Sequence, residues 1–141
     1  RATSICNKLN LEFALIHKEG KSESTSSGDR MGLVGDVRGK VAIIIDDIAD
    51  TFGTMGLAAE VLQQHGATKI YGIVTHGLLS GPAMDILHQS PLCRLATTNT
   101  VPQDCKQSLS DKVDVIDVSS IFAEAIRRTH NGESVSLLFR K

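Results

Sequence analysis

Two hydrophobic periods alternate along the chain. Short apolar runs, rich in Val, Ile and Leu, stand at residues 13–16, 33–37, 41–45, 70–75, 95–98 and 113–116. Helical spacing of apolar residues is found at residues 2–9, 55–62, 83–88 and 121–126. Strands that alternate with helices are typical of βαβ units and a parallel sheet. We therefore expect an α/β fold, a three-layer domain with a mostly parallel sheet of five strands.

Residues 41–45 (VAIII) give the strongest strand signal. Five apolar residues in a row indicate burial on both faces, as in the centre of a parallel sheet. The run stops at two carboxylates, Asp46 and Asp47, and a helical pattern resumes at Met55. The sequence therefore predicts a central strand whose carboxyl end carries polar chemistry.

The composition is ordinary for a globular domain and argues against several classes of partner. The chain has 141 residues, 41% hydrophobic and 22% charged, so we treat residues 1–141 as one domain. A net charge of -1 gives no reason to expect nucleic acid or an anionic membrane as a partner. No apolar run reaches the roughly 20 residues that span a bilayer, and no signal peptide is visible. The cysteines, odd in number and without metal-ligand spacing, favour a reduced, cytoplasmic chain.

Two stretches qualify this view. The chain begins at Arg1 without a methionine, and residues 2–9 already read as the body of a helix, which suggests a piece of a longer protein. Residues 18–30 are polar, rich in Ser and without periodicity. We interpret residues 18–30 as a flexible loop.

The segment at residues 46–54 (DDIADTFGT) is the main candidate for a ligand site. Open α/β sheets bind ligands outside the carboxyl ends of their strands, and this segment leads from such an end straight into a helix. The free N–H groups and the positive dipole end of a helix N-terminus favour an anion. Gly53 lets the backbone approach a ligand, and Thr51 and Thr54 add hydroxyl donors. We expect a phosphate cradle here.

The carboxylates of Asp46 and Asp47 offer acceptors beside this cradle, suited to sugar hydroxyls or to a bound metal. A plainer interpretation is open as well: the acidic pair ends a strand, and Asp50 or Thr51 caps the helix. An acidic pair alone does not separate the two interpretations. The hydrophobic run, the acidic pair and Asp-Thr-x-Gly-Thr together favour a phosphosugar site.

These residues resemble a known family. An apolar strand with an acidic pair, followed by ADTxGT, is similar to the type I phosphoribosyltransferase fold, whose loop holds a ribose 5-phosphate group. THGLLSGPA (residues 75–83), TNTVP (98–102) and EAIRRTHNGESVSLLF (124–139) resemble ribose-phosphate pyrophosphokinase, also called phosphoribosyl pyrophosphate (PRPP) synthetase, in its eukaryotic form. The resemblance covers nearly the whole chain. It implies the C-terminal half of such a protein.

The resemblance also implies a reaction. Members of the family transfer the β,γ-diphosphate of Mg-ATP to the anomeric hydroxyl of ribose 5-phosphate, which gives PRPP and AMP. By resemblance, Asp46 and Asp47 contact the ribose hydroxyls. The 5-phosphate is bound by Asp50, Thr51, Phe52, Gly53 and Thr54.

In the family, ATP and most Mg²⁺ contacts come from the N-terminal half and a neighbouring subunit. The resemblance therefore implies no metal site within this half and no activity for this half alone. Its implied partners are ribose 5-phosphate, ATP, the N-terminal half and sister subunits.

A catalytic loop falls, by resemblance, on residues 18–30, with Lys18 in the place of the family's catalytic lysine. Two residues later the family has an arginine, and this chain has Gly20. The difference matters because a guanidinium binds phosphate oxygens bidentately and glycine has no side chain. Lys21 or Arg30 are candidates to compensate. Without the resemblance, Lys18 reads as a solvated loop lysine.

Gly20 supports a second interpretation, in which the chain is a non-catalytic subunit that associates with the synthetase and regulates it. The intact loop at residues 46–54 favours catalytic ancestry instead. A third interpretation, a purine- or pyrimidine-type phosphoribosyltransferase, is disfavoured by the NGESVSLLF tail and the absence of a base-binding hood.

The C-terminal tail carries, by resemblance, a regulatory site in which Ser134, Ser136 and Phe139 bind phosphate or ADP at a subunit interface. The alternation of apolar and polar residues fits equally a tail that packs while its serines face outward. His76, at the carboxyl end of an expected strand, is interpreted as a hydrogen-bonded structural residue.

Overall fold

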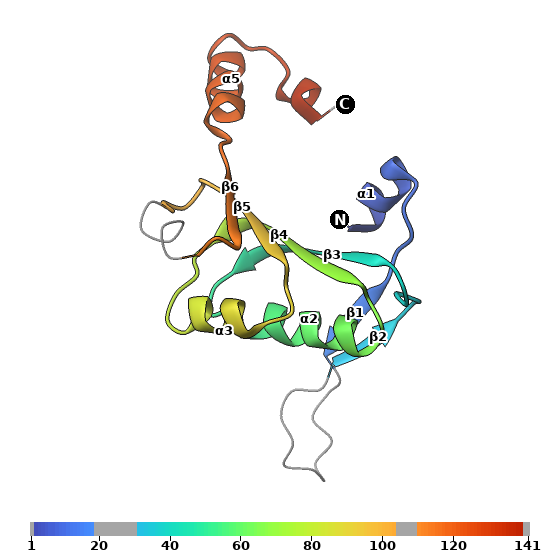
Figure 1. Ribbon diagram of the computed structural model, residues 1–141. Helices are drawn as coiled ribbons and strands as arrows, with labels where there is room; N and C mark the ends of the chain where they lie inside the picture. Colours follow the sequence, from blue (N-terminus) through green and yellow to red (C-terminus); the bar gives the residue numbers. More distant parts are fainter. Residues whose placement is uncertain (1, 19–30, 104–109, 140–141) are drawn as a thin grey trace.

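The computed structural model describes residues 2–18, 31–103 and 110–139, which Figure 1 shows in colour. In chain order the elements are α1 (Ala2–Leu9), β1 (Leu15–Lys18), β2 (Met31–Val34), β3 (Val41–Ala49), α2 (Gly53–Gln64), β4 (Lys69–Gly77), α3 (Ala83–Gln89), β5 (Arg94–Thr98), β6 (Val113–Ile116), α5 (Ser119–His130) and the 3-10 helix η1 (Val135–Phe139). Most lie within a few residues of their expected positions. Beyond Lys18, the loop expected at residues 18–30 lies outside the described residues. No described helix is long and apolar enough to cross a membrane.

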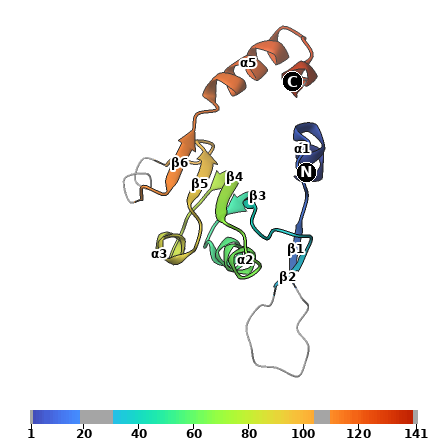
Figure 2. The same cartoon turned by 45° about the vertical axis from the view of Figure 1, so that its right-hand side comes forward.

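A parallel sheet forms the centre of the domain. Its strands lie in the order β3-β4-β5-β6, and each pairs in parallel with its neighbour. Helices α2 and α3 connect β3 to β4 and β4 to β5, and both lie on one face of this sheet (Figures 1 and 2). The expected α/β class and the mostly parallel sheet are therefore confirmed.

The core lies between the sheet and these two helices. Its largest fully buried side chains are Ile70, Val74, Leu87, Leu92, Leu95 and Thr97. In β4 buried residues alternate with more exposed ones, as a strand's period of two requires when one face is covered. In α2, Met55, Ala59 and Leu62 contribute to the same core at helical spacing. Burial between one sheet face and two helices thus stabilises the fold.

The parallel sheet has four strands in the described part of the chain, not the five expected. β1 and β2 do not join it. They pair antiparallel with each other, from Leu15 opposite Val34 to Lys18 opposite Met31. Antiparallel pairing needs no long crossover, so two strands that follow each other in the chain can form a separate ribbon.

β3 lies at the edge of the sheet, which corrects the expectation of a central strand buried on both faces. Ala42 and Ile44 pack against the core, whereas Val41 and Ile43 are 57% and 49% exposed. The run of five apolar residues places apolar side chains on both faces of β3. Within the described residues, only one of its faces and one of its edges are covered.

The expected third layer is incomplete. α1 and α5 lie away from α2 and α3, beyond the other side of the sheet (Figures 1 and 2). Neither helix contains a buried residue, and the apolar side chains of Ile121, Phe122 and Ile126 in α5 are exposed. The described residues therefore form two packed layers and leave an apolar sheet face uncovered.

Gly77, the last residue of β4, packs against β5 without room for a side chain. A Cβ at Gly77 would lie 2.7 Å from Thr97 Oγ1 and 3.2 Å from Thr97 Cβ. Thr97 is fully buried and stiff at χ1, so its side chain cannot move aside at low cost. We predict that Gly77→Ala lowers the free energy of unfolding by about 1–3 kcal/mol in denaturant titrations. Adding Thr97→Ala removes the clashing Oγ1 and should recover most of this loss; no recovery would contradict the packing argument.

Candidate functional site

The acidic pair lies inside β3 rather than after its end. Asp46 is opposite Val74 and Ile48 is opposite His76, with Asp47 between them in β3. Asp46 Oδ1 accepts a hydrogen bond from the Asp47 backbone N–H at 2.9 Å. Both residues are exposed at the carboxyl edge of the sheet.

The N-terminus of α2 lies directly after this strand end. The helix begins at Gly53, and its first backbone bond runs from the Gly56 N–H to the Phe52 carbonyl at 2.9 Å. The N–H groups of Gly53, Thr54 and Met55 therefore precede the helical ladder. In the described chain no side chain caps them, and the first turn contains no acidic residue. Neither Asp50 nor Thr51 is the cap, in contrast to the plainer interpretation of this segment.

Phe52 shapes the loop through its backbone. Its φ is 65°, a left-handed value, and its side chain is only 3% exposed within the core. A left-handed backbone costs a non-glycine residue about 1–3 kcal/mol, and burial of a phenylalanine contributes roughly 1.5–3 kcal/mol in return. Because the ring is buried, any contact of Phe52 with a ligand must come from its main chain.

Gly53 leaves space in front of the helix. A Cβ at this position would meet only Thr51 Oγ1, at 3.9 Å, which is an ordinary contact. Neither packing nor a positive φ requires glycine here. The described fold therefore leaves room at the start of α2 that no packing contact of Gly53 fills.

Residues of a second loop, which the sequence reasoning missed, contact the first. The Leu79 N–H donates to the Ala49 carbonyl at 3.1 Å, and the Ser80 N–H donates to the Asp50 carbonyl at 3.0 Å. The Ser80 hydroxyl donates to Asp50 Oδ1. These residues belong to THGLLSGPA, and the Ser-Gly-Pro turn after a strand was the available signal.

His76 is hydrogen-bonded at the same edge. Its Nδ1 lies 2.8 Å from Thr100 Oγ1. The Thr98 hydroxyl, which also lies 2.9 Å from Thr100 Oγ1, donates to the Thr75 carbonyl at 2.7 Å. This network ties the end of β5 to β4, which fits the structural role expected for His76.

Lys18 is not on the parallel sheet. It is the exposed last residue of β1, opposite Met31 in the antiparallel ribbon. Gly20, Lys21 and Arg30 lie outside the described residues. The structure therefore places the candidate catalytic lysine on a different element from the loop at residues 46–54.

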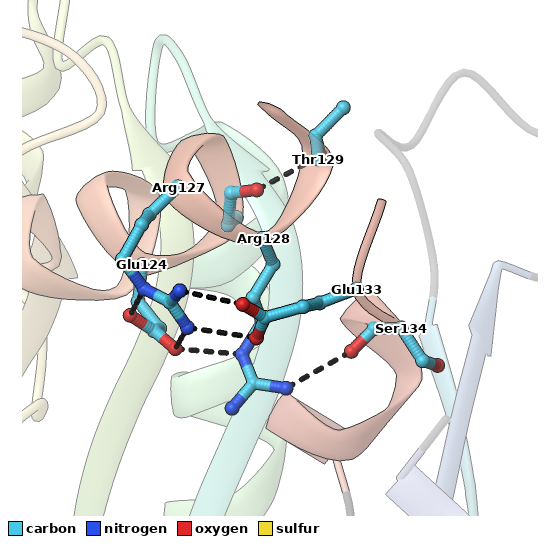
Figure 3. Close-up of polar contacts among 7 residues, drawn as sticks. Glu124, Arg127, Arg128, Thr129, Glu133 and Ser134 are labelled. Atoms are coloured by element: carbon cyan, nitrogen blue, oxygen red, sulfur yellow. Dashed lines mark hydrogen bonds and ion pairs between the residues drawn. The ribbon is translucent and has the colours of Figure 1, made fainter. Parts of the chain in front are cut away.

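Of the C-terminal residues expected to bind a regulatory anion, Ser134 is hydrogen-bonded to α5 (Figure 3). Ser134 Oγ and Ser136 Oγ lie 2.8 Å apart, and Arg128 donates to the Ser134 carbonyl at 3.1 Å. The Phe139 side chain is 73% exposed, so the tail does not pack through it as an ordinary terminal segment would. Ser134, Ser136 and Phe139 all lie in or next to η1.

Two glutamates hold this region together, and the sequence reasoning did not single them out. Arg127 makes paired hydrogen bonds to Glu133, at 2.7 and 2.9 Å, and to Glu124, at 2.9 Å each (Figure 3). Arg128 shares Glu124 at 2.7 Å. Hydrogen bonds from Arg127 and then Arg128 lower the pKa of Glu124 to about 2, and Arg127 likewise lowers the pKa of Glu133. The i, i+3 and i, i+4 spacing of Glu124 was the available sequence signal.

The fold and this edge define a class: an α/β domain with an uncapped helix N-terminus and two exposed carboxylates at the carboxyl ends of a parallel sheet. Comparison with known proteins is more specific. The sequence profile of the family described as phosphoribosyl synthetase-associated domain matches residues 26–140. The chain is 54% identical over 139 residues to ribose-phosphate pyrophosphokinase 2 of Schizosaccharomyces pombe, which covers 99% of this chain and 43% of that protein.

A solved structure is similar as well. The crystal structure of phosphoribosylpyrophosphate synthetase from Mycobacterium smegmatis matches with a TM-score of 0.80 and 30% identity, over 93% of this chain and 41% of that chain. The chain therefore belongs to the PRPP synthetase family, which confirms the resemblance read from its motifs. It spans less than half the length of both relatives.

The ion pairs on α5 generate a pH prediction. The pKa of Glu124 falls from 4.5 to about 2 on folding, so its contribution is fully present above pH 4.5 and is lost as pH falls through the folded value. We predict that the ion pairs of Glu124 with Arg127 and Arg128 are lost as pH falls from about 4.5 to about 2, followed by carbon-13 NMR of the Glu124 carboxyl group. Arg127→Gln should raise the pKa of Glu124. A pKa near 4.5 in the unmodified chain would contradict the network.

Proposed function

We propose that this chain is the ribose 5-phosphate-binding half of a PRPP synthetase, which transfers the β,γ-diphosphate of Mg-ATP to ribose 5-phosphate to give PRPP and AMP. The observation that carries the proposal is the N-terminus of α2, where N–H groups without a side-chain cap follow two exposed carboxylates. Membership of the family supports the proposed reaction. The geometry at the N-terminus of α2 supports this position for ribose 5-phosphate. The half alone is expected to be inactive.

The 5-phosphate lies, in this proposal, before the first turn of α2. The backbone N–H groups of Gly53, Thr54 and Met55 donate to its oxygens, and the helix dipole favours its charge. The hydroxyls of Thr51 and Thr54 are on exposed residues and add donors. Gly53 contributes the close approach that a Cβ would obstruct.

The sugar lies beside Asp46 and Asp47, whose carboxylates accept hydrogen bonds from the ribose hydroxyls. The side chains of Asp50 and Phe52 do not bind the phosphate in this proposal. An ionised Asp50 carboxylate is only an acceptor and cannot donate to a phosphate dianion, while the Phe52 ring is buried. We therefore assign these two residues to the shape of the loop.

Transfer of a diphosphate is stabilised by cations around the charge that develops on it. Lys18, exposed at the end of β1, is the proposed catalytic cation of this chain. Among the described residues no three His, Cys, Asp or Glu side chains gather into a metal site. One or two carboxylates with water and substrate oxygens suffice for Mg²⁺, so Asp46 and Asp47 fit as contacts, with most contacts to Mg-ATP made by the other half. Bound Mg²⁺ supplies neutralisation of the diphosphate charge.

The uncovered apolar face supports the proposed partners, the N-terminal half of the parent protein and sister subunits. Ile43 and Ile73 are 49% and 41% exposed on this face of the sheet. The apolar side chains of α5 are exposed too. Exposed apolar patches of this kind mark contacts with other protein surfaces. In this proposal the N-terminal half supplies most of the contacts to ATP, so ATP is bound only in the assembled protein.

The tail supports a proposed regulatory site for phosphate or ADP at Ser134, Ser136 and Phe139. Two adjacent hydroxyls offer donors to an anion, and the exposed Phe139 ring offers a surface on which a base can stack. The Arg128 side chain beside Ser134 adds positive charge.

The second candidate is a non-catalytic regulatory subunit associated with the synthetase. Gly20 in place of the family's loop arginine favours it. The exposed acidic pair and the uncapped helix favour the enzyme, because a subunit without catalysis has no need to keep them.

The proposed phosphate site predicts a variant that binds ribose 5-phosphate more weakly without losing stability. Gly53→Ala places a methyl group where the phosphate approaches, yet strains nothing in the described fold. We predict about 10-fold weaker ribose 5-phosphate binding by calorimetry in the full-length protein, consistent with the loss of one to two hydrogen bonds, and no fall in the melting temperature.

Gly56→Ala, one turn along α2, is the matched control. Its Cβ would lie 2.9 Å from Ile86 Cγ2, between α2 and α3, so it should disturb packing and leave the affinity for ribose 5-phosphate unchanged. Equal affinity of the wild type and Gly53→Ala for ribose 5-phosphate would contradict a phosphate site at the N-terminus of α2.

Catalysis is tested by AMP formation in the full-length protein with ATP, Mg²⁺ and ribose 5-phosphate, beside its Gly20→Arg variant. We expect activity in the wild type, and a higher rate when the guanidinium restores a bidentate phosphate contact. No activity in the wild type with activity in Gly20→Arg would favour the regulatory subunit.

A further inference from the structure

The loop at residues 78–82 contacts Asp50 but has no part in the function described so far. The parallel ladder of β3 and β4 ends at Ala49 opposite Gly77. Beyond this pair the chains stay together, because the Leu79 N–H and the Ser80 N–H donate to the carbonyls of Ala49 and Asp50. The Ser80 hydroxyl adds a bond to Asp50 Oδ1, so Asp50 is held at both its main chain and its carboxylate.

Two left-handed residues flank this contact. Phe52 has a φ of 65° and Leu79 a φ of 46°, and both side chains are buried in the core. Neither residue is a glycine, so burial must hold both backbones in these conformations. Buried Phe52 and buried Leu79 thus fix the backbone on either side of the Asp50–Ser80 contact.

The position of Asp50 calls for such a restraint. Aspartate is among the strongest caps of a helix N-terminus, and Asp50 stands two residues before the N-cap residue Phe52. Nevertheless no side chain caps α2 in the described chain. A carboxylate on the N–H groups of Gly53 and Thr54 would occupy the donors that an anionic ligand needs and would repel it.

We propose that Ser80 is a positioning residue whose hydroxyl holds the Asp50 carboxylate away from the N-terminus of α2, so that the helix donors stay available to the phosphate of ribose 5-phosphate. This inference rests on the proposed function of the loop. The Ser80 N–H bond to the Asp50 carbonyl does not need the hydroxyl. Ser80→Ala therefore releases the carboxylate and leaves the main-chain pairing in place.

The test is a double-mutant cycle in the full-length protein, with ribose 5-phosphate titrations on the wild type, Ser80→Ala, Asp50→Ala and the double variant. We expect roughly 5- to 10-fold weaker binding in Ser80→Ala, the worth of one charge-assisted hydrogen bond. Ser80→Ala should have little further effect once Asp50 is alanine, because the hydroxyl acts through that carboxylate. Ser80→Thr, which keeps a hydroxyl, should bind like the wild type. Equal losses from Ser80→Ala in both backgrounds would overturn the proposal.

Ser120→Ala on α5 is the control, and its affinity for ribose 5-phosphate should equal that of the wild type. Failure of the wild type itself to bind would overturn the proposed function. A ligand-free measurement then decides the role of Ser80. In Ser80→Ala the amide protons of Gly53 and Thr54 should shift downfield, because the released Asp50 carboxylate accepts hydrogen bonds from them. Adding Asp50→Ala to this variant should abolish the shift. Amide shifts in Ser80→Ala unchanged from the wild type would overturn the proposal.

Discussion

The parallel pairing of β3 with β4 is the constraint on which the candidate site depends. Its register, with Ala49 opposite Gly77, ends both strands at the same level of the sheet. The chain therefore leaves both strands at one edge and continues into α2 and α3 on one face (Figure 1). Buried Phe52 and Leu79 fix the two exits, so the loop that presents Asp46, Asp47 and the helix donors is held by the core itself.

The same arrangement separates a packed part of the chain from a sparsely covered part. The largest fully buried side chains belong to the core between the sheet and helices α2 and α3, and the candidate phosphosugar loop lies at the edge of that core. The ribbon of β1 and β2 packs Ile16 and Leu33 against the edge of that core, and its Lys18 is exposed. Helices α1 and α5 contain no buried residue. In the proposed enzyme, this half therefore contains the sugar-binding residues. Lys18 and the regulatory tail depend on contacts from other parts of the assembly.

Local patterns were enough to predict most of the strands and helices, because hydrophobic period is a property of short segments. They ended the strand before Asp46, whereas β3 continues to Ala49. They did not predict that β3 is an edge strand, since that depends on which strands pair across the sheet. Nor did they predict the buried left-handed Phe52, or the contacts of Ser80 and Glu124, which require distant segments to meet or rotamers to be fixed. The effect of Gly20 depends on residues outside the described part of the chain.

The most direct measurement is a crystal structure of the full-length protein soaked with ribose 5-phosphate. The account predicts phosphate oxygens about 2.7–3.2 Å from the backbone nitrogens of Gly53 and Thr54, with the ribose hydroxyls turned to Asp46 and Asp47. Ribose 5-phosphate bound elsewhere, for instance at the tail beside Arg128, with nothing at the N-terminus of α2, would contradict it.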